Sequence, residues 1–262
     1  PTENEDGTFG VQEYKPIEVW TGYSGTKVAS YKTIAEAAAN LGENKWIIVA
    51  KDYTLTENFS FADGIYLDVV KGATLTVAEG VTITRDSSDS TGGDSASFYG
   101  VGAAALVTGG TLTMENAEIS TDAEGGAGVF ACGSGVATAK NTVISTRRGT
   151  SGGIHVAGGT LYAENLTVTT EDASSAAIRS DRGGGTMVVN GSSYTASGFG
   201  SPAVYVTADI SISDATLTAT GPEALCLEGK NSVTLTNCTL TGSVLVSGES
   251  DLTITVSEYI AE

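Results

Sequence analysis

The sequence predicts one elongated all-β domain in which short parallel strands wind into a solenoid. Six segments repeat with starts 25, 24, 26, 23 and 23 residues apart, and a fixed period of this length is typical of stacked structural repeats. The second and fourth residues of each segment are apolar, which is the two-residue period of a strand with one buried face. The segments are Thr111–Asn116, Val136–Asn141, Thr160–Asn165, Thr186–Gly191, Asp209–Asp214 and Ser232–Asn237.

Each repeat has room for about three short strands and none for a helix. A second alternating run closes each unit, as in Ile154–Val156 and Val204–Val206, and small or turn-forming residues separate the runs. Each unit is therefore expected to form one coil. Successive coils would stack about 4.8 Å apart, with strands of neighbouring coils pairing in parallel.

The sixth residue of each unit is Asn, Asp or Gly. These residues tolerate the left-handed backbone that a sharp corner between strands requires. We expect their side chains to stack as a structural ladder in which each amide bonds to the next coil. The pair Asn190-Gly191 breaks the ladder at one rung. The ladder residues are Asn116, Asn141, Asn165, Asp214 and Asn237.

Asn165-Leu-Thr, like Asn58-Phe-Ser, also fits the pattern of a glycosylation acceptor. As a ladder residue, Asn165 is expected to be buried.

Coil length, three strands per coil and corner asparagines are marks of the right-handed parallel β-helix proteins. Over roughly residues 30 to 256 the chain resembles this pectin-lyase-like superfamily, including its pectate-lyase-like bacterial adhesins and surface proteins. The resemblance implies the fold but no single activity, because the superfamily contains lyases, hydrolases, phage tailspikes and non-catalytic adhesins. Leucine-rich repeats have a similar period but need more leucines and a bulkier second half, whereas these second halves are rich in Gly, Ala and Thr.

The N-terminal part divides into a tail and a cap. Residues 1–15 are acidic and lack periodicity, so we expect a flexible tail or linker, a tether to a larger protein or to a lipid anchor. The β-helix domain would then span residues 16–262. Thr33 and Glu36 fit a capping box, which predicts a short helix near residues 33–41 that covers the open end of the solenoid. Its apolar face would carry Ile34, Ala37, Ala38 and Leu41, ahead of first strands at Trp46–Ala50 and Ile65–Val70.

Residues 85–99 interrupt the coils with Ser, Gly and Asp, which predicts a protruding loop insertion. Asp86, Asp89 and Asp94 could bind Ca²⁺, although their spacing matches no known calcium loop. We expect no cofactor, and Ca²⁺ is the one alternative. At the other end, residues 257–262 either fold over the last coil or lead into another domain.

Charge and composition exclude several classes of binding partner. The net charge of −18, from 31 acidic and 13 basic residues, argues against nucleic acid and anionic membranes. No apolar run approaches the length of a membrane-spanning segment, and three cysteines do not make a disulfide framework. The chain begins at Pro1, so we expect a processed or trimmed protein that is secreted or displayed at the cell surface.

Two groups of cationic residues occupy adjacent coils. Four of the five arginines and the single histidine fall within 36 residues. Arg147 and Arg148 stand at a corner where the neighbouring coils carry acidic residues. We expect an inter-coil salt-bridge ladder of little energetic value there. The acidic residues are Asp122, Glu124, Glu171 and Asp172.

The second group is a column at the twentieth place of four consecutive units, formed by Phe130, His155, Arg179 and Tyr205. Their sequence neighbours are apolar or small and should point inward, so these four side chains are expected to point outward. Aromatic faces for stacking and cations for charge-assisted hydrogen bonds are typical of a sugar or anion site. With Asp181 and Arg182 beside the column, these six are the ligand-binding candidates, and Arg179 would be available for a carboxylate or sulfate. The alternative is a strand face covered by a loop or partner.

The resemblance implies how an enzyme of the superfamily would look. Its lyases use a carboxylate cluster for Ca²⁺ with an Arg or Lys base, and its hydrolases use three Asp residues with Gly-His-Gly and Arg-x-Lys. Neither set is present, because His155 stands in Gly-Ile-His-Val and Arg179 is followed by Ser-Asp. One histidine supports no zinc site or Ser/His/Asp triad, so catalytic residues cannot be named.

We therefore expect a non-catalytic surface or secreted protein that binds a glycan or a host or cell-surface protein. The alternative is a polysaccharide lyase or glycoside hydrolase acting on an acidic polysaccharide. A third pattern is weaker: Thr-x-Thr pairs such as Thr167/Thr169 and Thr216/Thr218 resemble the arrays of ice-binding β-solenoids, but Glu118 and Val143 interrupt them.

Overall fold

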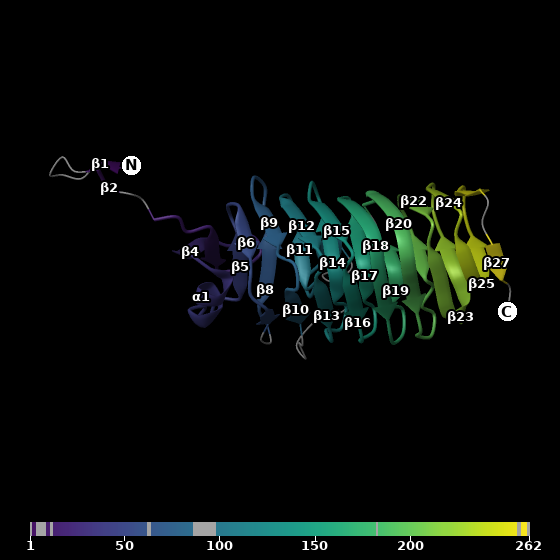
Figure 1. Ribbon diagram of the computed structural model, residues 1–262, viewed down its shortest axis with the longest axis horizontal. Coiled ribbons are helices and arrows are strands. Elements are labelled where there is room, and N and C mark those ends of the chain that lie inside the picture. Colours follow the sequence, from purple (N-terminus) through teal and green to yellow (C-terminus); the bar gives the residue numbers. More distant parts are fainter. Residues whose placement is uncertain are drawn as a thin grey trace.

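The computed structural model is a parallel β-solenoid of about eight turns, with its coils stacked along the long axis (Figure 1). It describes residues 2–3, 9–10, 13–61, 64–85, 98–181, 183–255 and 258–260, with the backbone alone for 2–3, 9–10 and 258–260. The predicted all-β class is confirmed. From β5 onward, each strand of the solenoid pairs in parallel with its counterpart in the next coil, which gives three faces.

The first face carries the repeat segments. Its strands are β6 (Tyr53–Leu55), β9 (Thr74–Val77), β12 (Thr111–Glu115), β15 (Val136–Lys140), β18 (Thr160–Thr170), β20 (Thr186–Ala196), β22 (Asp209–Ser213), β24 (Ser232–Thr236) and β26 (Asp251–Thr255).

The second face follows the corner that ends each repeat segment. Its strands are β7 (Phe59–Phe61), β10 (Thr82–Arg85), β13 (Glu118–Thr121), β16 (Val143–Thr146), the later parts of β18 and β20, and the first parts of β23 (Thr216–Leu227) and β25 (Thr239–Val246), with β27 (Glu258–Ile260) last.

The third face carries the column that the sequence singled out. Its strands are β3 (Ile17–Trp20), β4 (Lys27–Tyr31), β5 (Trp46–Val49), β8 (Tyr66–Val69), β11 (Ala105–Val107), β14 (Ala127–Cys132), β17 (Gly152–Ala157), β19 (Ala176–Ser180) and β21 (Val204–Val206), followed by the later parts of β23 and β25. A separate two-stranded antiparallel sheet, β1 (Thr2–Glu3) with β2 (Phe9–Gly10), precedes them.

The apolar places of the repeat stack in register inside the solenoid. Leu112 pairs with Ala137, Ala137 with Leu161, and Leu161 with Met187, and all four side chains are fully buried. Burying a Leu or Met side chain contributes about 1.5–3 kcal/mol. Because the same place is apolar in every coil, the core forms a continuous interior rather than separate clusters.

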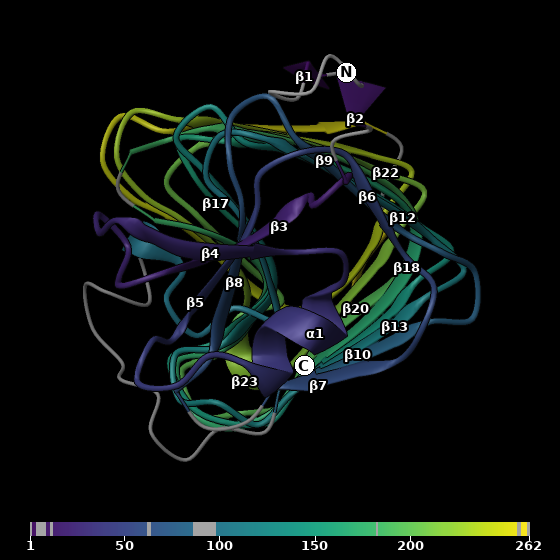
Figure 2. The same ribbon diagram turned by 90° about the vertical axis from the view of Figure 1, so that its left-hand side faces the viewer.

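The predicted cap helix is present and closes the N-terminal end. In α1 (Ile34–Ala39) the hydroxyl of Thr33 accepts from the backbone N–H of Glu36, and Ile34 and Ala37 are fully buried. Figure 2 looks onto this end and shows α1, β3 and β4 lying across it. The open edge of the first coil is thereby covered.

The sequence prediction missed two strands ahead of the helix. The first strands were expected at residues 46–50 and 65–70, but β3 and β4 come earlier and pair antiparallel, and β3 also pairs antiparallel with β5. The alternation of Ile17-Glu-Val-Trp20 is strand-like, but β4 has no fully buried residue and carries little pattern. Because β3 runs antiparallel to β5, the parallel pairing of the third face ends at β5.

The corner residues have the expected backbone but not the expected burial. Their φ angles lie between 46° and 55° at Asn116, Asn141, Asn165, Asp214 and Asn237, and Gly191 takes φ 79° at the interrupted rung. Asn165 Nδ2 donates to Asn141 Oδ1 at 3.3 Å, and Asn237 Nδ2 donates to Asp214 Oδ1 at 2.6 Å.

The expectation that Asn165 is buried is wrong, because all five ladder side chains are exposed along the outer edge of the corner. The residue that follows each one turns inward instead, as Leu166 and Cys238 do.

Several sequence predictions fall outside the described residues: Asp86, Asp89 and Asp94 of the insertion, Arg182, and residues 256–257 and 261–262. In the C-terminal segment, the backbone of β27 pairs in parallel with β25 and adds a rung to the second face. Cys132, Cys226 and Cys238 are free thiols. No described helix has the length and apolar character of a membrane span.

Candidate functional site

The predicted column stacks in register on the third face. Phe130 of β14 pairs with His155 of β17, which pairs with Arg179 of β19, which pairs with Tyr205 of β21. The register continues toward the N-terminus and defines what we call the outer column. Its members are Ile48, Asp68, Leu106, Phe130, His155, Arg179 and Tyr205.

The prediction that this column is exposed is wrong for its middle. Phe130, His155 and Arg179 are only 0%, 2% and 8% exposed. A Cβ on Gly100 would lie 2.7 Å from both Leu106 Cδ1 and Phe130 Cγ, so the chain just after the insertion lies directly against the column. Phe130 and Leu106 belong to an apolar cluster outside the main core. The strand alternation predicted the direction of these side chains correctly, but the segment at Gly100 covers Leu106 and Phe130.

Arg179 is engaged within the fold. Its Nε donates to Asp181 Oδ2 at 2.9 Å, and its Nη1 donates to the carbonyl oxygens of Thr150 at 2.7 Å and Ser151 at 3.0 Å. A longer contact of 3.4 Å reaches the carbonyl of Ser174. The expectation that Arg179 is available for a carboxylate or sulfate is therefore wrong, since the guanidinium already ties three corner carbonyls to a carboxylate.

His155 and Asp181 complete a buried polar cluster. The ring of His155 lies 4.2 Å from that of Phe130, and its Nε2 lies 2.9 Å from Asp181 Oδ2. Burial lowers the pKa of His155 to about 4, so the imidazole is neutral at neutral pH. Burial opposes ionisation of Asp181, but His155 and Arg179 outweigh it, so the pKa of Asp181 lies below its usual value.

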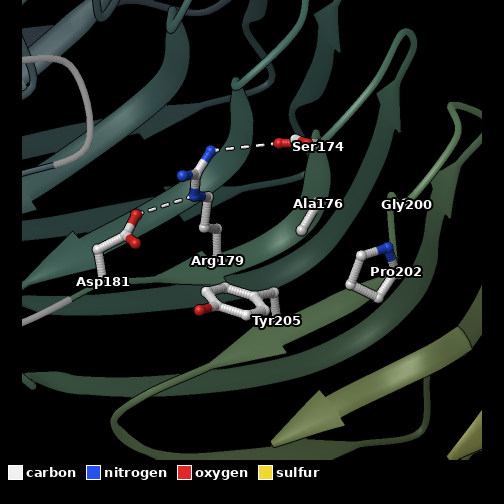
Figure 3. Close-up of a pocket in the computed structure, with 7 residues that line it drawn as sticks. All are labelled: Ser174, Ala176, Arg179, Asp181, Gly200, Pro202 and Tyr205. Atoms are coloured by element: carbon white, nitrogen blue, oxygen red, sulfur yellow. Dashed lines mark hydrogen bonds and ion pairs between the residues drawn. The ribbon is translucent and has the colours of Figure 1, made fainter. Parts of the chain in front are cut away.

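A hollow of about 260 Å³ opens at the C-terminal end of the outer column, and we call it the Tyr205 hollow (Figure 3). The half-buried ring of Tyr205 lies beside Arg179, and its hydroxyl donates to Glu228 Oε2 at 3.0 Å. Among the described residues that line it, Asp181 is the one carboxylate. Hydrolysis of a glycosidic bond uses two. The hollow is lined by Ser174, Ala176, Arg179, Asp181, Gly200, Pro202 and Tyr205.

The arginine corner is simpler than predicted. Arg148 Nε lies 3.0 Å from Asp122 Oδ1, with 58% of the arginine side chain exposed. Asp172 Oδ1 instead accepts from the backbone N–H of Ala173. In the described part of the chain, Arg147, Glu124 and Glu171 form no ion pair. One exposed pair contributes little.

Sequence reasoning missed a buried serine ladder at the same corner. Ser151 N donates to Ser175 Oγ at 3.2 Å, and Ser175 N donates to Ser201 Oγ at 2.9 Å. All three are 2% exposed or less. Their repetition at one place in three successive units was the available signal. The ladder fixes this corner. The carbonyl oxygens of Thr150, Ser151 and Ser174 at the same corner accept hydrogen bonds from Arg179.

The Thr-x-Thr pairs also align, on the second face. Thr167 pairs with Ser193, Ser193 with Thr216, and Thr216 with Thr239. Glu118 and Val143 occupy the preceding rungs of the same row, as the sequence indicated. In the described residues no three His, Cys, Asp or Glu side chains gather as metal ligands would.

Comparison with known proteins adds one match. A stretch of 104 residues is 31% identical to a protein named alpha-amylase from Clostridium acetobutylicum; it covers 36% of this chain and 13% of that protein. The chain thus corresponds to a small part of this relative. No family model matches the chain, and no solved structure matches it.

Proposed function

We propose that this chain is a non-catalytic module of a secreted or cell-surface protein, of the pectin-lyase-like type, that binds a neutral glycan in the Tyr205 hollow. The observation that carries the proposal is the half-buried aromatic ring beside a fixed carboxylate in a surface hollow of about 260 Å³.

Each part of the hollow has a use in sugar recognition. The C–H face of a sugar ring packs on an aromatic ring such as that of Tyr205. Both side-chain contacts to Asp181 from Arg179 and His155 use Oδ2, which leaves Oδ1 to accept a sugar hydroxyl. Because Arg179 holds Asp181 in place before any ligand arrives, less ordering free energy is lost on binding.

A neutral glycan fits better than an acidic one. Arg179 already contacts Asp181 and three carbonyls, and the net charge of −18 repels a polyanion. The match to a protein whose name is that of a carbohydrate-acting enzyme supports a carbohydrate ligand. Acidic polysaccharides remain the substrates of the alternative, a lyase or hydrolase.

The test is a binding screen on the whole chain, by calorimetry, against neutral oligosaccharides, polygalacturonate, alginate and host glycans, with and without Ca²⁺. Tyr205→Ala should weaken binding about tenfold, from the loss of an aromatic contact of about 1.5 kcal/mol. Tyr205→Phe keeps the ring and should retain affinity. Tyr162→Ala is the matched control, because Tyr162 is 46% exposed and lies on the first face.

Two outcomes would overturn the proposal. Release of reducing ends or unsaturated sugars by the wild-type chain would identify an enzyme. Loss of binding in Tyr162→Ala but not in Tyr205→Ala would place the glycan on the first face.

A further inference from the structure

A second hollow, of about 250 Å³, opens at the N-terminal end of the outer column, and we call it the Asp68 hollow. Trp20 comes from β3 and Tyr23 from the turn before β4, while Asp68 comes from β8. The hollow is lined by Trp20, Tyr23, Ile48, Asp68, Val70 and Thr108.

Asp68 is a buried carboxyl group with neutral hydrogen-bond donors around it. It is 4% exposed, and it accepts from the backbone N–H of Thr108 at 3.1 Å and from the Thr108 hydroxyl at 2.8 Å. In the described residues no Lys, Arg or His forms an ion pair with it. Burial raises its pKa to about 6, so it is mostly ionised at neutral pH.

A buried charge without a counter-charge is costly, and proteins normally pair such groups. An ionised carboxylate has about four acceptor sites, so the donors of Thr108 and the backbone N–H of Val69 do not saturate Asp68. A cation in the hollow would supply the missing charge.

The aromatic residues of this hollow are held in place by their neighbours. The indole Nε1 of Trp20 donates to Glu18 Oε2 at 2.9 Å. The ring of Tyr23 packs edge-on against Trp46, with centroids 5.3 Å apart, and Trp46 in turn stacks on Tyr66 at 4.7 Å. Rings fixed in this way attract cations through the negative charge on their faces.

We propose that the Asp68 hollow binds a small organic ammonium ion, which Trp20 and Tyr23 contact through their rings and Asp68 through its carboxylate. A hollow of about 250 Å³ suits a head group rather than a polymer. The net charge of −18 raises the local concentration of cations. The site is separate from the Tyr205 hollow, because the buried side chains of Leu106, Phe130 and His155 lie between them in the outer column.

The experiment titrates the chain with choline and with n-butylammonium, and follows tryptophan fluorescence and calorimetric heat. The two probes distinguish a quaternary from a primary ammonium ligand. The control ligand is 3,3-dimethylbutan-1-ol, which has the shape of choline without its charge. We expect saturable binding of at least one ammonium probe, and at least tenfold weaker binding of the alcohol.

Two variants locate the site. Asp68→Asn keeps an acceptor for Thr108 but removes the charge, and should weaken binding at least tenfold. Asp251→Asn, at an exposed carboxylate on the first face, changes the net charge equally and should bind as the wild type. Should Asp68→Asn fail to fold, Tyr23→Ala replaces it, since Tyr23 is 46% exposed, and it should also lose tenfold.

Equal binding of choline and its neutral analogue, equal effects of Asp68→Asn and Asp251→Asn, or no saturable binding of either ammonium probe would each overturn the proposal. Competition by millimolar Ca²⁺ at the same site would overturn it too, because the ligand would then be an inorganic cation.

Discussion

Acid should act on this fold in two opposite ways, through His155 and through Asp68. His155 is buried with a pKa of about 4 against an ordinary 6.5. The unfolded chain therefore takes up a proton as the pH falls through 6.5 while the folded chain does not, so stability is lost between pH 6.5 and 4. Asp68 has a raised pKa of about 6 against 3.8. Its contribution is greatest below pH 3.8 and is lost as the pH rises through 6.

The two magnitudes follow from 1.36 kcal/mol per pKa unit. Between pH 7 and 5, His155 should lower the free energy of unfolding by about 2 kcal/mol and Asp68 should raise it by about 1 kcal/mol. Asp181, whose pKa lies below its usual value, stays ionised throughout this range. The wild type should thus lose about 1 kcal/mol, whereas Asp68→Asn should lose about 2 and His155→Gln should gain about 1.

The assay is urea unfolding at pH 7 and pH 5, followed by tryptophan fluorescence, for the wild type and both variants. The remaining carboxylates are common to the three proteins, so their contributions cancel in the comparison. If wild type and His155→Gln lose the same free energy on acidification, then His155 takes up its proton equally in the folded and unfolded chains, and the account of a buried neutral imidazole fails.

Two further substitutions test the packing. Asn141→Leu puts a branched side chain at φ 46° and removes the partner of Asn165. It should lower the free energy of unfolding by about 1–2 kcal/mol in chemical unfolding, whereas Asn141→Gly should lower it by less. Equal unfolding midpoints for the two variants would argue against backbone strain. Gly152→Ala would place its Cβ 3.2 Å from His155 Nδ1 and 3.3 Å from Arg179 Cβ. It should lower the free energy of unfolding by about 1–3 kcal/mol in thermal unfolding. The control is Gly22→Ala, whose Cβ would have no atom within 4 Å, and it should leave the unfolding midpoint nearly unchanged.

The fold could be predicted from the sequence because every coil of a solenoid needs the same kinds of residue at the same places. Leu112, Ala137, Leu161 and Met187 occupy one place in four successive coils, so each confirms the period set by the others. The antiparallel β3 and β4 were missed because the end of a solenoid has no neighbour that repeats its pattern. The alternation of Ile17 and Val19 was the only local sign.

The site was harder to predict, because direction and exposure are separate properties. Alternation showed that Phe130 and His155 point away from the main core, and their register is as expected. The segment around Gly100, from another part of the chain, packs against Phe130, and no local sequence pattern predicts such a contact. Asp68 was overlooked because it lies before the regular repeats. The column was recognised from its place within the aligned repeat units, and no aligned unit includes Asp68.

The third face therefore carries one column with a different environment at each end. In the middle, Leu106 and Phe130 are apolar and need cover, which the chain near Gly100 provides. One rung in from each end, the column carries Asp68 and Arg179, four rungs apart in register, or about 19 Å at 4.8 Å per rung. Sites so far apart share no side chain, and effects of substitutions at such distances usually add. We therefore expect Asp68→Asn to lose ammonium binding while its glycan binding stays unchanged. Each hollow can be tested separately, so either proposal can fail without the other.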